Sequence, residues 1–393
     1  MAGNTMLDIR KLLSIMNEHD ASDLYITVDS PPCYRVNGVV RPAGNRCLEP
    51  EETEMLAMSV MSERQQREFE ESNEQNLALY YSTLGRYRVN VFRQRGCVGM
   101  VIRQIKTKIA TIDDMALPQI LKEVSMAKRG LILLVGATGS GKSTTLAAMV
   151  DYRNSNQAGH IISIEDPIEF VHGHKKSIVT QREIGMDTDN YHSALKNALR
   201  QAPDVVYIGE IRDLETMESA LTFAETGHLC LATLHSNNAN QAMERVMNFF
   251  PAERHNQIYL QLSMNLRGVV SQRLVRTGDG TRVAAVEILL STPRIKDLIC
   301  KGKITEIKEA MEISTTLGMQ SFDQHLFTLY SEGRISFEEA LKNADSSNNL
   351  RLRIKLAKDG TLEEQPQAFA GAKKDSEDKQ LLGDANLKLQ VEG

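Results

Sequence analysis

Paired cysteines are missing from this sequence of 393 residues. Its cysteines are scattered, and no two of them form a CxxC motif; they stand at positions 33, 47, 97, 230 and 300. Because their number is odd and their spacing is irregular, the sequence argues against a disulfide framework and against a cysteine zinc site. This use of cysteine is typical of a protein in a reducing compartment.

Long apolar runs and a secretory signal are also absent. The longest apolar runs, such as LILLV at 131–135, are far too short to cross a bilayer. The N-terminal segment MAGNTMLDIRKLLSIMNEHD has no charged region followed by an apolar one. We therefore expect a cytoplasmic protein that reaches a membrane only by docking on a component already there.

An excess of basic residues is lacking as well. The formal net charge is -5 and the pI is close to 6.0, so electrostatics provide no reason to expect nucleic acid as a partner. Hydrophobic residues make up 41% of the chain, which is enough for a sizeable core. The length allows about two or three domains of ordinary size.

The first part of the chain, residues 1–105, mixes helical and strand patterns. Its predicted elements are a helix at 6–16, a strand at 23–28, a hairpin at 33–40, a helix at 51–71 and strands between 77 and 105. We therefore expect a small α+β domain over 1–105. A short linker follows at 106–112.

From residue 113 the pattern changes, because short β-branched runs alternate with helical stretches. This alternation is the signature of a parallel sheet with helices on both faces. We expect an α/β domain over 113–346. Its expected strands are 131–135, 160–165, 204–209 and 228–234, with helices from 141 and near 190–201, 213–225 and 238–247, followed by helices from 253 and a strand pair near 270–290.

The last segment, residues 347–393, is polar, mixed in charge and low in aromatic residues. Such a composition does not bury enough apolar surface to offset the entropy of ordering, so we expect a largely disordered tail. The alternative is a short amphipathic helix at 349–357 that binds a partner.

The stretch GATGSGKST at 136–144 carries the strongest chemical signal, because it follows a predicted buried strand and opens a helix. Its glycines let backbone N–H groups surround phosphate oxygens, Lys142 can reach the β and γ phosphates, and the Ser143 hydroxyl can bind Mg²⁺. The positive end of the helix adds to this attraction. We predict that ATP and Mg²⁺ bind at Gly136, Ala137, Thr138, Gly139, Ser140, Gly141, Lys142, Ser143 and Thr144, with Ser143 as the metal ligand.

Carboxylates follow two other predicted strands. Such a site needs a carboxylate at the end of a neighbouring strand, to hold metal-bound water or to polarise the attacking water. Glu210 comes directly after 204–209, and Glu165 ends 160–165. The alternative for Glu210 is a pairing with Arg212 at the start of a helix. Spacing alone does not divide the role of base between Glu165 and Glu210.

Two histidines flank the predicted strand 228–234. His228 stands before the apolar run, and His235 follows it. A histidine at a strand end can sense the γ-phosphate or bridge to a neighbour. The alternative for each is a buried histidine whose hydrogen bonds are satisfied.

Arginines recur on the predicted N-terminal strands, at Arg86, Arg88 and Arg103. Exposed arginines are usually part of a solvated surface. An ATPase, however, needs cations that neutralise charge on the transferred phosphoryl group, and an arginine from an adjoining domain can provide one.

Taken together, GATGSGKST, ISIEDPIEF, DVVYIGEIRD and AETGHLCLATLHSNNA resemble the four conserved boxes of the secretion-superfamily ATPases. The segments ASDLYI, PPCYRVNGVV and GMQSFDQHLFTLYSEGRIS resemble the type IV pilus retraction ATPases, PilT and its paralogue PilU. The resemblance covers residues 6 to about 343.

The resemblance implies a homohexameric motor at the inner face of the cytoplasmic membrane, at the pilus base. Each subunit would join an N-terminal PAS-like domain to a RecA-like P-loop NTPase domain, with ATP between them. Hydrolysis would act on an inner-membrane platform protein and drive retraction. Residue by residue, the resemblance implies that Lys142 and Ser143 hold nucleotide and magnesium, that Glu165, Glu210, His228 and His235 belong to the catalytic boxes, and that Arg88 and Arg103 face ATP.

Some positions depart from the PilT pattern. Tyr25 stands where the family often has histidine, and PRIKDLIC at 293–300 keeps only part of a helix that the PilT branch uses in retraction. With the longer tail, these differences favour the PilU branch, in which the motor assists a PilT-type ATPase. The longer N-terminal region and four-cysteine zinc module of the assembly ATPases are lacking.

Two other functional classes stay open. RecA-like rings also move along nucleic acid, but the acidic net charge and the lack of a basic, aromatic-bearing groove motif speak against this function. The other class is a scaffold or regulatory subunit whose own hydrolysis is dispensable. Intact Lys142, Ser143 and Glu210 argue against an inactive site, although an intact site does not prove that turnover is needed.

Overall fold

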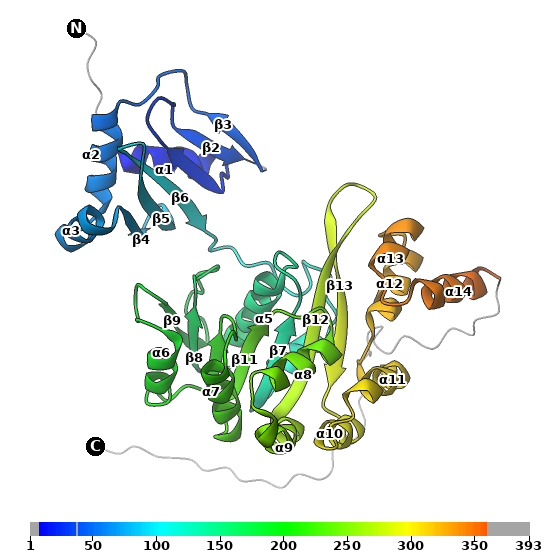
Figure 1. Cartoon of the computed structure of the whole chain (residues 1–393). Helices are drawn as coiled ribbons and strands as arrows, with labels where there is room; N and C mark the ends of the chain where they lie inside the picture. The colour runs from blue at the N-terminus through cyan, green and yellow to red at the C-terminus, as the bar shows by residue number, and fades with distance from the viewer. Residues whose placement is uncertain (1–7, 37, 360–393) are drawn as a thin grey trace, which may run out of the picture.

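Two β-sheets organise the chain, and the computed structural model describes residues 8–36 and 38–359 (Figure 1). The first sheet has six strands in the order β3-β2-β1-β6-β5-β4, and the second has seven in the order β13-β12-β7-β11-β10-β8-β9. Residue 37, in the predicted hairpin turn, and residues 360–393 of the predicted tail lie outside the described part. The α/β prediction is confirmed, whereas the PAS-like detail and the domain boundaries stay predictions.

Neighbouring strands of the first sheet run antiparallel. Its elements are α1 (Ile9–Glu18), β1 (Asp23–Ile26), β2 (Cys33–Val36), β3 (Val39–Pro42), α2 (Pro50–Val60), α3 (Glu63–Ser72), β4 (Glu74–Tyr81), β5 (Gly85–Gln94) and β6 (Cys97–Ile105). Leu13, Leu24 and Phe69 are fully buried where helices meet the sheet. The helix expected over 51–71 is two helices, because Ser62 accepts a hydrogen bond from the Gln65 N–H and starts α3 as its N-cap.

The second sheet is parallel apart from its edge hairpin β12–β13. Its strands are β7 (Gly130–Val135), β8 (Gly159–Glu165), β9 (Ser177–Glu183), β10 (Val205–Ile208), β11 (Leu229–Leu234), β12 (Leu266–Arg276) and β13 (Arg282–Leu290). Its helices are α4 (Ile120–Ser125), α5 (Lys142–Asn156), α6 (Tyr191–Ala198), α7 (Leu214–Glu225), α8 (Ala239–Asn248) and α9 (His255–Asn265).

Side chains of the parallel strands alternate between two cores, as the strand period of two residues requires. Leu131 and Leu133 of β7 pack with α6, α7, α8 and α9, whereas Ile132 and Leu134 pack with α4 and α5. Helices therefore cover both faces of the sheet, as predicted. Because the parallel strands point the same way, their carboxyl ends meet at one edge.

Strand β9 was not predicted. It pairs in parallel with β8 over its full length and extends the sheet beyond the expected strands. The sequence SIVTQRE is too polar to signal a strand by hydrophobicity, because an edge strand buries only part of its side chains.

The C-terminal helices are α10 (Pro293–Cys300), α11 (Ile307–Ile313), α12 (Phe322–Ser331), α13 (Phe337–Asn343) and α14 (Ser347–Lys358). The last of these shows that the first part of the segment predicted to be largely disordered, residues 347–358, is a helix, as in the alternative prediction. Leu350 and Ile354, four residues apart, bury one face of α14 in the core that includes α12 and α13. The Arg353 guanidinium lies 4.7 Å from the Phe327 ring centroid, so a cationic side chain adds to the packing.

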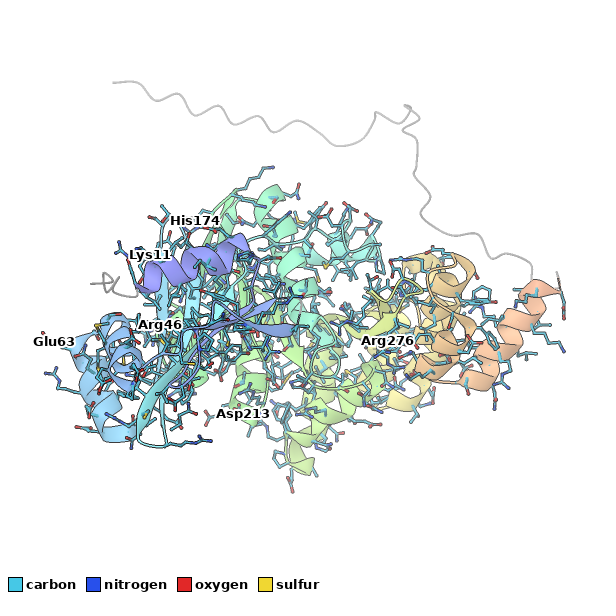
Figure 2. All side chains as sticks on the ribbon, turned by 90° about the horizontal axis from the view of Figure 1, so that it is seen from above. Lys11, Arg46, Glu63, His174, Asp213 and Arg276 are labelled. Atoms are coloured by element: carbon cyan, nitrogen blue, oxygen red, sulfur yellow. The ribbon has the colours of Figure 1, made fainter. Side chains whose placement is uncertain are left out.

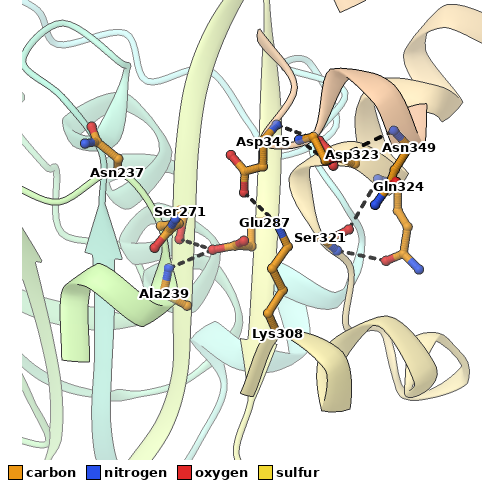
Figure 3. A network of polar contacts seen from close by, with 12 residues as sticks. Asn237, Ala239, Ser271, Glu287, Lys308, Ser321, Asp323, Gln324, Asp345 and Asn349 are labelled. Atoms are coloured by element: carbon orange, nitrogen blue, oxygen red, sulfur yellow. Dashed lines mark hydrogen bonds and ion pairs between the residues drawn. The ribbon is translucent and has the colours of Figure 1, made fainter. Parts of the chain in front are cut away.

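Polar contacts join these helices to the edge hairpin, and the contacts of Asp345 with Lys308 and with Asp323 are drawn in Figure 3. Asp345, between α13 and α14, pairs with Arg273 of β12 at 2.6 Å and with Lys308 of α11 at 3.2 Å. The Asp323 carboxylate accepts hydrogen bonds from the backbone N–H groups of Asp345 and Ser346. The helix foreseen as the alternative at 349–357 therefore packs on its own chain, and its binding to a partner stays untested.

The linker leads from β6 to the second sheet and contacts the loop after β8. Lys106 forms an isolated parallel bridge with Phe170, and its carbonyl accepts from the Val171 N–H. In the view from above, Arg46 and Glu63 lie on the side of the first sheet and Arg276 lies toward the C-terminal helices (Figure 2). None of the helices in the described ranges is long and apolar enough to cross a membrane.

Candidate functional site

The phosphate-loop sequence forms the connection between β7 and α5. Residues 137–139 are exposed at its tip, while Gly136 and Ser140 are buried at its base. Gly141 has φ +86°, and a Cβ there would lie 2.7 Å from Gln272 Nε2. The loop therefore needs glycine at 141 for its backbone conformation and for its close approach to β12.

Lys142 opens α5 and is buried, with 8% of its surface exposed. Its ammonium donates to the carbonyls of Gly136 at 2.8 Å and Ala137 at 2.9 Å. Burial lowers the pKa of Lys142, and the negative charge of Glu210 opposes this shift. The lysine is thus held inside the loop, on the side of the site where Glu210 lies.

The loop residues fit a triphosphate and a magnesium ion. The Ser140 hydroxyl is buried, and within the described residues it has no hydrogen-bond partner. Ser143 lies half-buried in the first turn of α5, where the helix dipole favours negative charge. A buried hydroxyl without a partner at a helix N-terminus is well placed to bind an anion.

Glu210 lies at the carboxyl edge, two residues after β10. Its Oε2 accepts from Arg212 Nε at 2.8 Å, and its Oε1 lies 3.0 Å from His235 Nε2. Arg212 also reaches Asp166 at 3.3 Å, so the group joins the ends of β8, β10 and β11. The Arg212 pairing expected as the alternative is present, yet it leaves Glu210 next to His235 at the edge that carries the phosphate loop.

Glu165 ends β8 and is almost completely buried. Its Oε1 accepts from Ser163 Oγ at 2.6 Å and from Gln181 Nε2 at 3.2 Å. Burial raises the pKa of Glu165 to about 7, and these hydrogen bonds oppose the shift only in part. At neutral pH this carboxyl group can therefore hold or release a proton.

A pH dependence of stability follows from the buried Glu165. Unfolded, this side chain titrates near 4.5, whereas folding raises its pKa to about 7. Between these values the folded state binds more protons, so the free energy of unfolding falls as pH rises, by roughly 3 kcal/mol in total. We expect Glu165→Gln to flatten this decline when Tm is measured from pH 5 to pH 8. Parallel curves for the two chains would contradict the prediction, and Glu215→Gln, at an exposed position, is the control.

His228 is not brought to this edge, and its catalytic role stays a prediction. It precedes β11, and its carbonyl accepts from the N–H of Gly130, the first residue of β7. It therefore lies at the amino ends of the strands, opposite the phosphate loop. Its ring packs edge-on against Phe223 at 5.6 Å and its Nδ1 contacts the Thr226 hydroxyl, as expected of a satisfied histidine.

Arg88 and Arg103 lie opposite each other on β5 and β6 of the first sheet. Arg103 Nε donates to Asp23 at 2.8 Å, while 69% of its side chain is exposed. This hydrogen bond raises the pKa of Arg103, and the charge of Glu169 adds a smaller contribution. The charge of Arg88 acts on Glu183 at the end of β9, where burial raises the carboxyl pKa. Both arginines thus influence acidic groups near the ends of β8 and β9, and their contact with ATP stays a prediction.

Sequence reasoning missed the wall that β12 builds beside the phosphate loop. A hollow of about 330 Å³ lies there, and Gln272 and Arg273 line it together with loop residues. Arg273 also donates to the Asn343 carbonyl at 2.7 Å and lies 3.9 Å from the Phe322 ring centroid. No motif marks these side chains, because they reach the loop only through the pairing of β12 with β7.

Known proteins are similar to this chain in sequence and in fold. Residues 4–366 match the family described as Type II/IV secretion system protein. The chain is 56% identical over 351 residues to the type IV pilus ATPase PilU of Pseudomonas aeruginosa, covering 89% of this chain and 92% of that protein. It is 43% identical over 343 residues to the PilT retraction ATPase of that organism, covering 87% of this chain and 100% of the relative. The crystal structure of the pilus retraction motor PilT with bound ADP superposes with a TM-score of 0.82 at 40% identity, covering 88% of this chain and 99% of that one.

Proposed function

The chain belongs to the type II/IV secretion system protein family, and on that premise we propose that it is an ATPase that powers or assists type IV pilus retraction in twitching motility. The resemblance drawn from the four motifs is confirmed, and the chain is more similar to PilU than to PilT of the same organism. The observation that carries the proposal is the meeting of the phosphate loop, Glu210 and His235 at one sheet edge.

The roles of the residues follow from their positions. Backbone N–H groups of 136–141 and the Lys142 ammonium bind the phosphates of ATP, and the Ser143 hydroxyl would hold the magnesium ion. The ion supplies positive charge that neutralises the phosphate oxygens. Glu210 orients the attacking water, because its carboxylate lies at the open edge near Lys142, while that of Glu165 is buried against Ser163 and Gln181.

The remaining parts of the proposal concern assembly. The motor is a homohexamer that works with a PilT-type ATPase and acts on the inner-membrane platform protein of the pilus. It lies in the cytoplasm at the membrane's inner face and reaches the membrane only through this platform. Arg88 and Arg103 approach ATP when the first sheet closes on the phosphate loop. The pairing of Arg103 with Asp23 supports this, because it leaves most of the arginine exposed.

Labelled pili imaged in living cells test the motor function directly. Three strains are compared: one with the intact gene, one with the gene deleted, and one with Lys142→Ala. We expect impaired retraction under load in both altered strains, because the alanine chain has lost its phosphate-binding cation. Normal retraction with Lys142→Ala but not with the deletion would show a scaffold that needs no turnover. Normal retraction in the deletion strain would remove the proposed role in retraction.

A further inference from the structure

Gln272 occupies a special place on β12. The parallel pairing of β12 with β7 ends at Ser271 and Val135, so Gln272 is the next residue along, where β7 gives way to the phosphate loop. Its side chain is 4% exposed although it is polar. A buried side-chain amide normally has hydrogen-bond partners for both its oxygen and its NH2 group.

Both ends of this amide bond to the nucleotide-binding segment. Gln272 Nε2 donates to the Ser140 carbonyl at 2.8 Å, and Oε1 accepts from Thr145 Oγ1 at 2.7 Å. One side chain thus spans the end of the phosphate loop and the first turns of α5. Strand β12 therefore fixes the shape of the phosphate loop. It pairs with the opposite side of β7 from the strands that lead to Glu210.

The bond to Ser140 also sets the direction of a donor. The carbonyl of Ser140 and the N–H of Gly141 belong to one planar trans peptide, so they point in opposite directions. Because Gln272 holds this carbonyl on the β12 side, the Gly141 N–H faces away from β12. Gly141 has φ +86°, a flexible position that would otherwise allow the peptide to rotate.

We propose that Gln272 is a positioning residue for nucleotide binding, which acts by holding the Ser140–Gly141 peptide and the start of α5 in the orientation that phosphate requires. This inference rests on the proposed ATPase function. Gln272 contacts the phosphate loop and not the reacting atoms. Its loss should therefore weaken nucleotide binding more than it slows the hydrolysis of bound ATP. A donor turned away from phosphate no longer contributes its hydrogen bond.

The test is binding of an ADP that carries a methylanthraniloyl fluorophore on its ribose, with magnesium, to the full chain. We expect Gln272→Met, which keeps side-chain length but loses both hydrogen bonds, to raise Kd about 10-fold. Gln272→Glu keeps the acceptor for Thr145 but has no donor for Ser140, so it should weaken binding as well. KM for ATP should rise in both variants by a larger factor than kcat falls.

Gln320 offers a matched control, because its half-buried amide donates to the Val286 carbonyl at 2.8 Å without touching the loop. Gln320→Met should leave Kd and KM unchanged. Thr145→Val removes only the other partner of Gln272, and its effect should not add fully to that of Gln272→Met. Unchanged binding in Gln272→Met, or equal weakening in Gln320→Met, would overturn the proposal.

Two further outcomes are also decisive. If Gln272→Met does not fold, as judged by circular dichroism, Gln272→Glu decides, because it loses only the donor to the Ser140 carbonyl, and normal binding in that chain would refute the role of the amide. If the unmodified chain neither binds the probe nor hydrolyses ATP, the ATPase function fails together with the inference. If the unmodified chain binds the probe and hydrolyses ATP, and the Gln272 variants have the same Kd and KM, only the inference about Gln272 fails.

Discussion

Glu210→Gln is expected to reduce ATP hydrolysis by about 10²- to 10³-fold while leaving nucleotide binding nearly unchanged. The amide is nearly the same size as the carboxylate; its single oxygen can still accept the Arg212 hydrogen bond, and its NH2 can donate to a neutral His235 ring nitrogen. It lacks the negative charge and basicity that polarise an attacking water. The loss should therefore appear in kcat and not in Kd.

Phosphate release at saturating ATP measures the first quantity, and binding of the fluorescent ADP measures the second. Glu215→Gln is the matched control, because Glu215 lies in the first turn of α7 with 69% of its side chain exposed and pairs only with His192 among the described residues. A Glu210→Gln chain that hydrolyses ATP normally would transfer the role of base to Glu165. Equal losses in both variants would mean that the region responds to any change of charge.

The parts of the site that sequence could predict are those encoded within one short segment. The phosphate loop, Glu165, Glu210 and His235 each lie at or just after the carboxyl end of an apolar strand, and parallel strands bring these ends together. The same rule places His228 away from these residues. It precedes β11, so its position in the sequence already assigns it to the opposite edge.

The parts that sequence could not predict depend on partners far away along the chain. Gln272 reaches Ser140 across 132 positions, and only the register of β12 on β7 reveals the contact. Strand β9 was missed, and helix α14 was predicted only as the alternative, for a related reason. Both segments are polar in composition and are stabilised by contacts with neighbouring elements. The strand is stabilised by its hydrogen bonds to β8, and the helix by burial of Leu350 and Ile354.

Gly136→Ala is expected to weaken nucleotide binding by about 10²-fold. A Cβ at this position would lie 2.5 Å from the backbone oxygen of Gln272 and 2.5 Å from Ser140 Oγ. The serine hydroxyl can rotate away, but the Gln272 carbonyl belongs to β12, which is paired with β13 at this position. The loop itself must therefore move away from β12, and displaced N–H donors no longer converge on phosphate.

Titration of the fluorescent ADP into the Gly136→Ala chain measures this loss, with Tm recorded in parallel. Gly278→Ala, in the exposed turn after β12 where a Cβ meets nothing within 4 Å, should leave both quantities unchanged. Normal binding by Gly136→Ala would show that β12 moves to accommodate the new methyl group. Strand β12 would then be too mobile to position the phosphate loop. Weak binding with an unchanged Tm would show the opposite, because the strand would have kept its place while the loop lost its shape. The second outcome is the one that the pairing of Gln272 with Val286 of β13 favours.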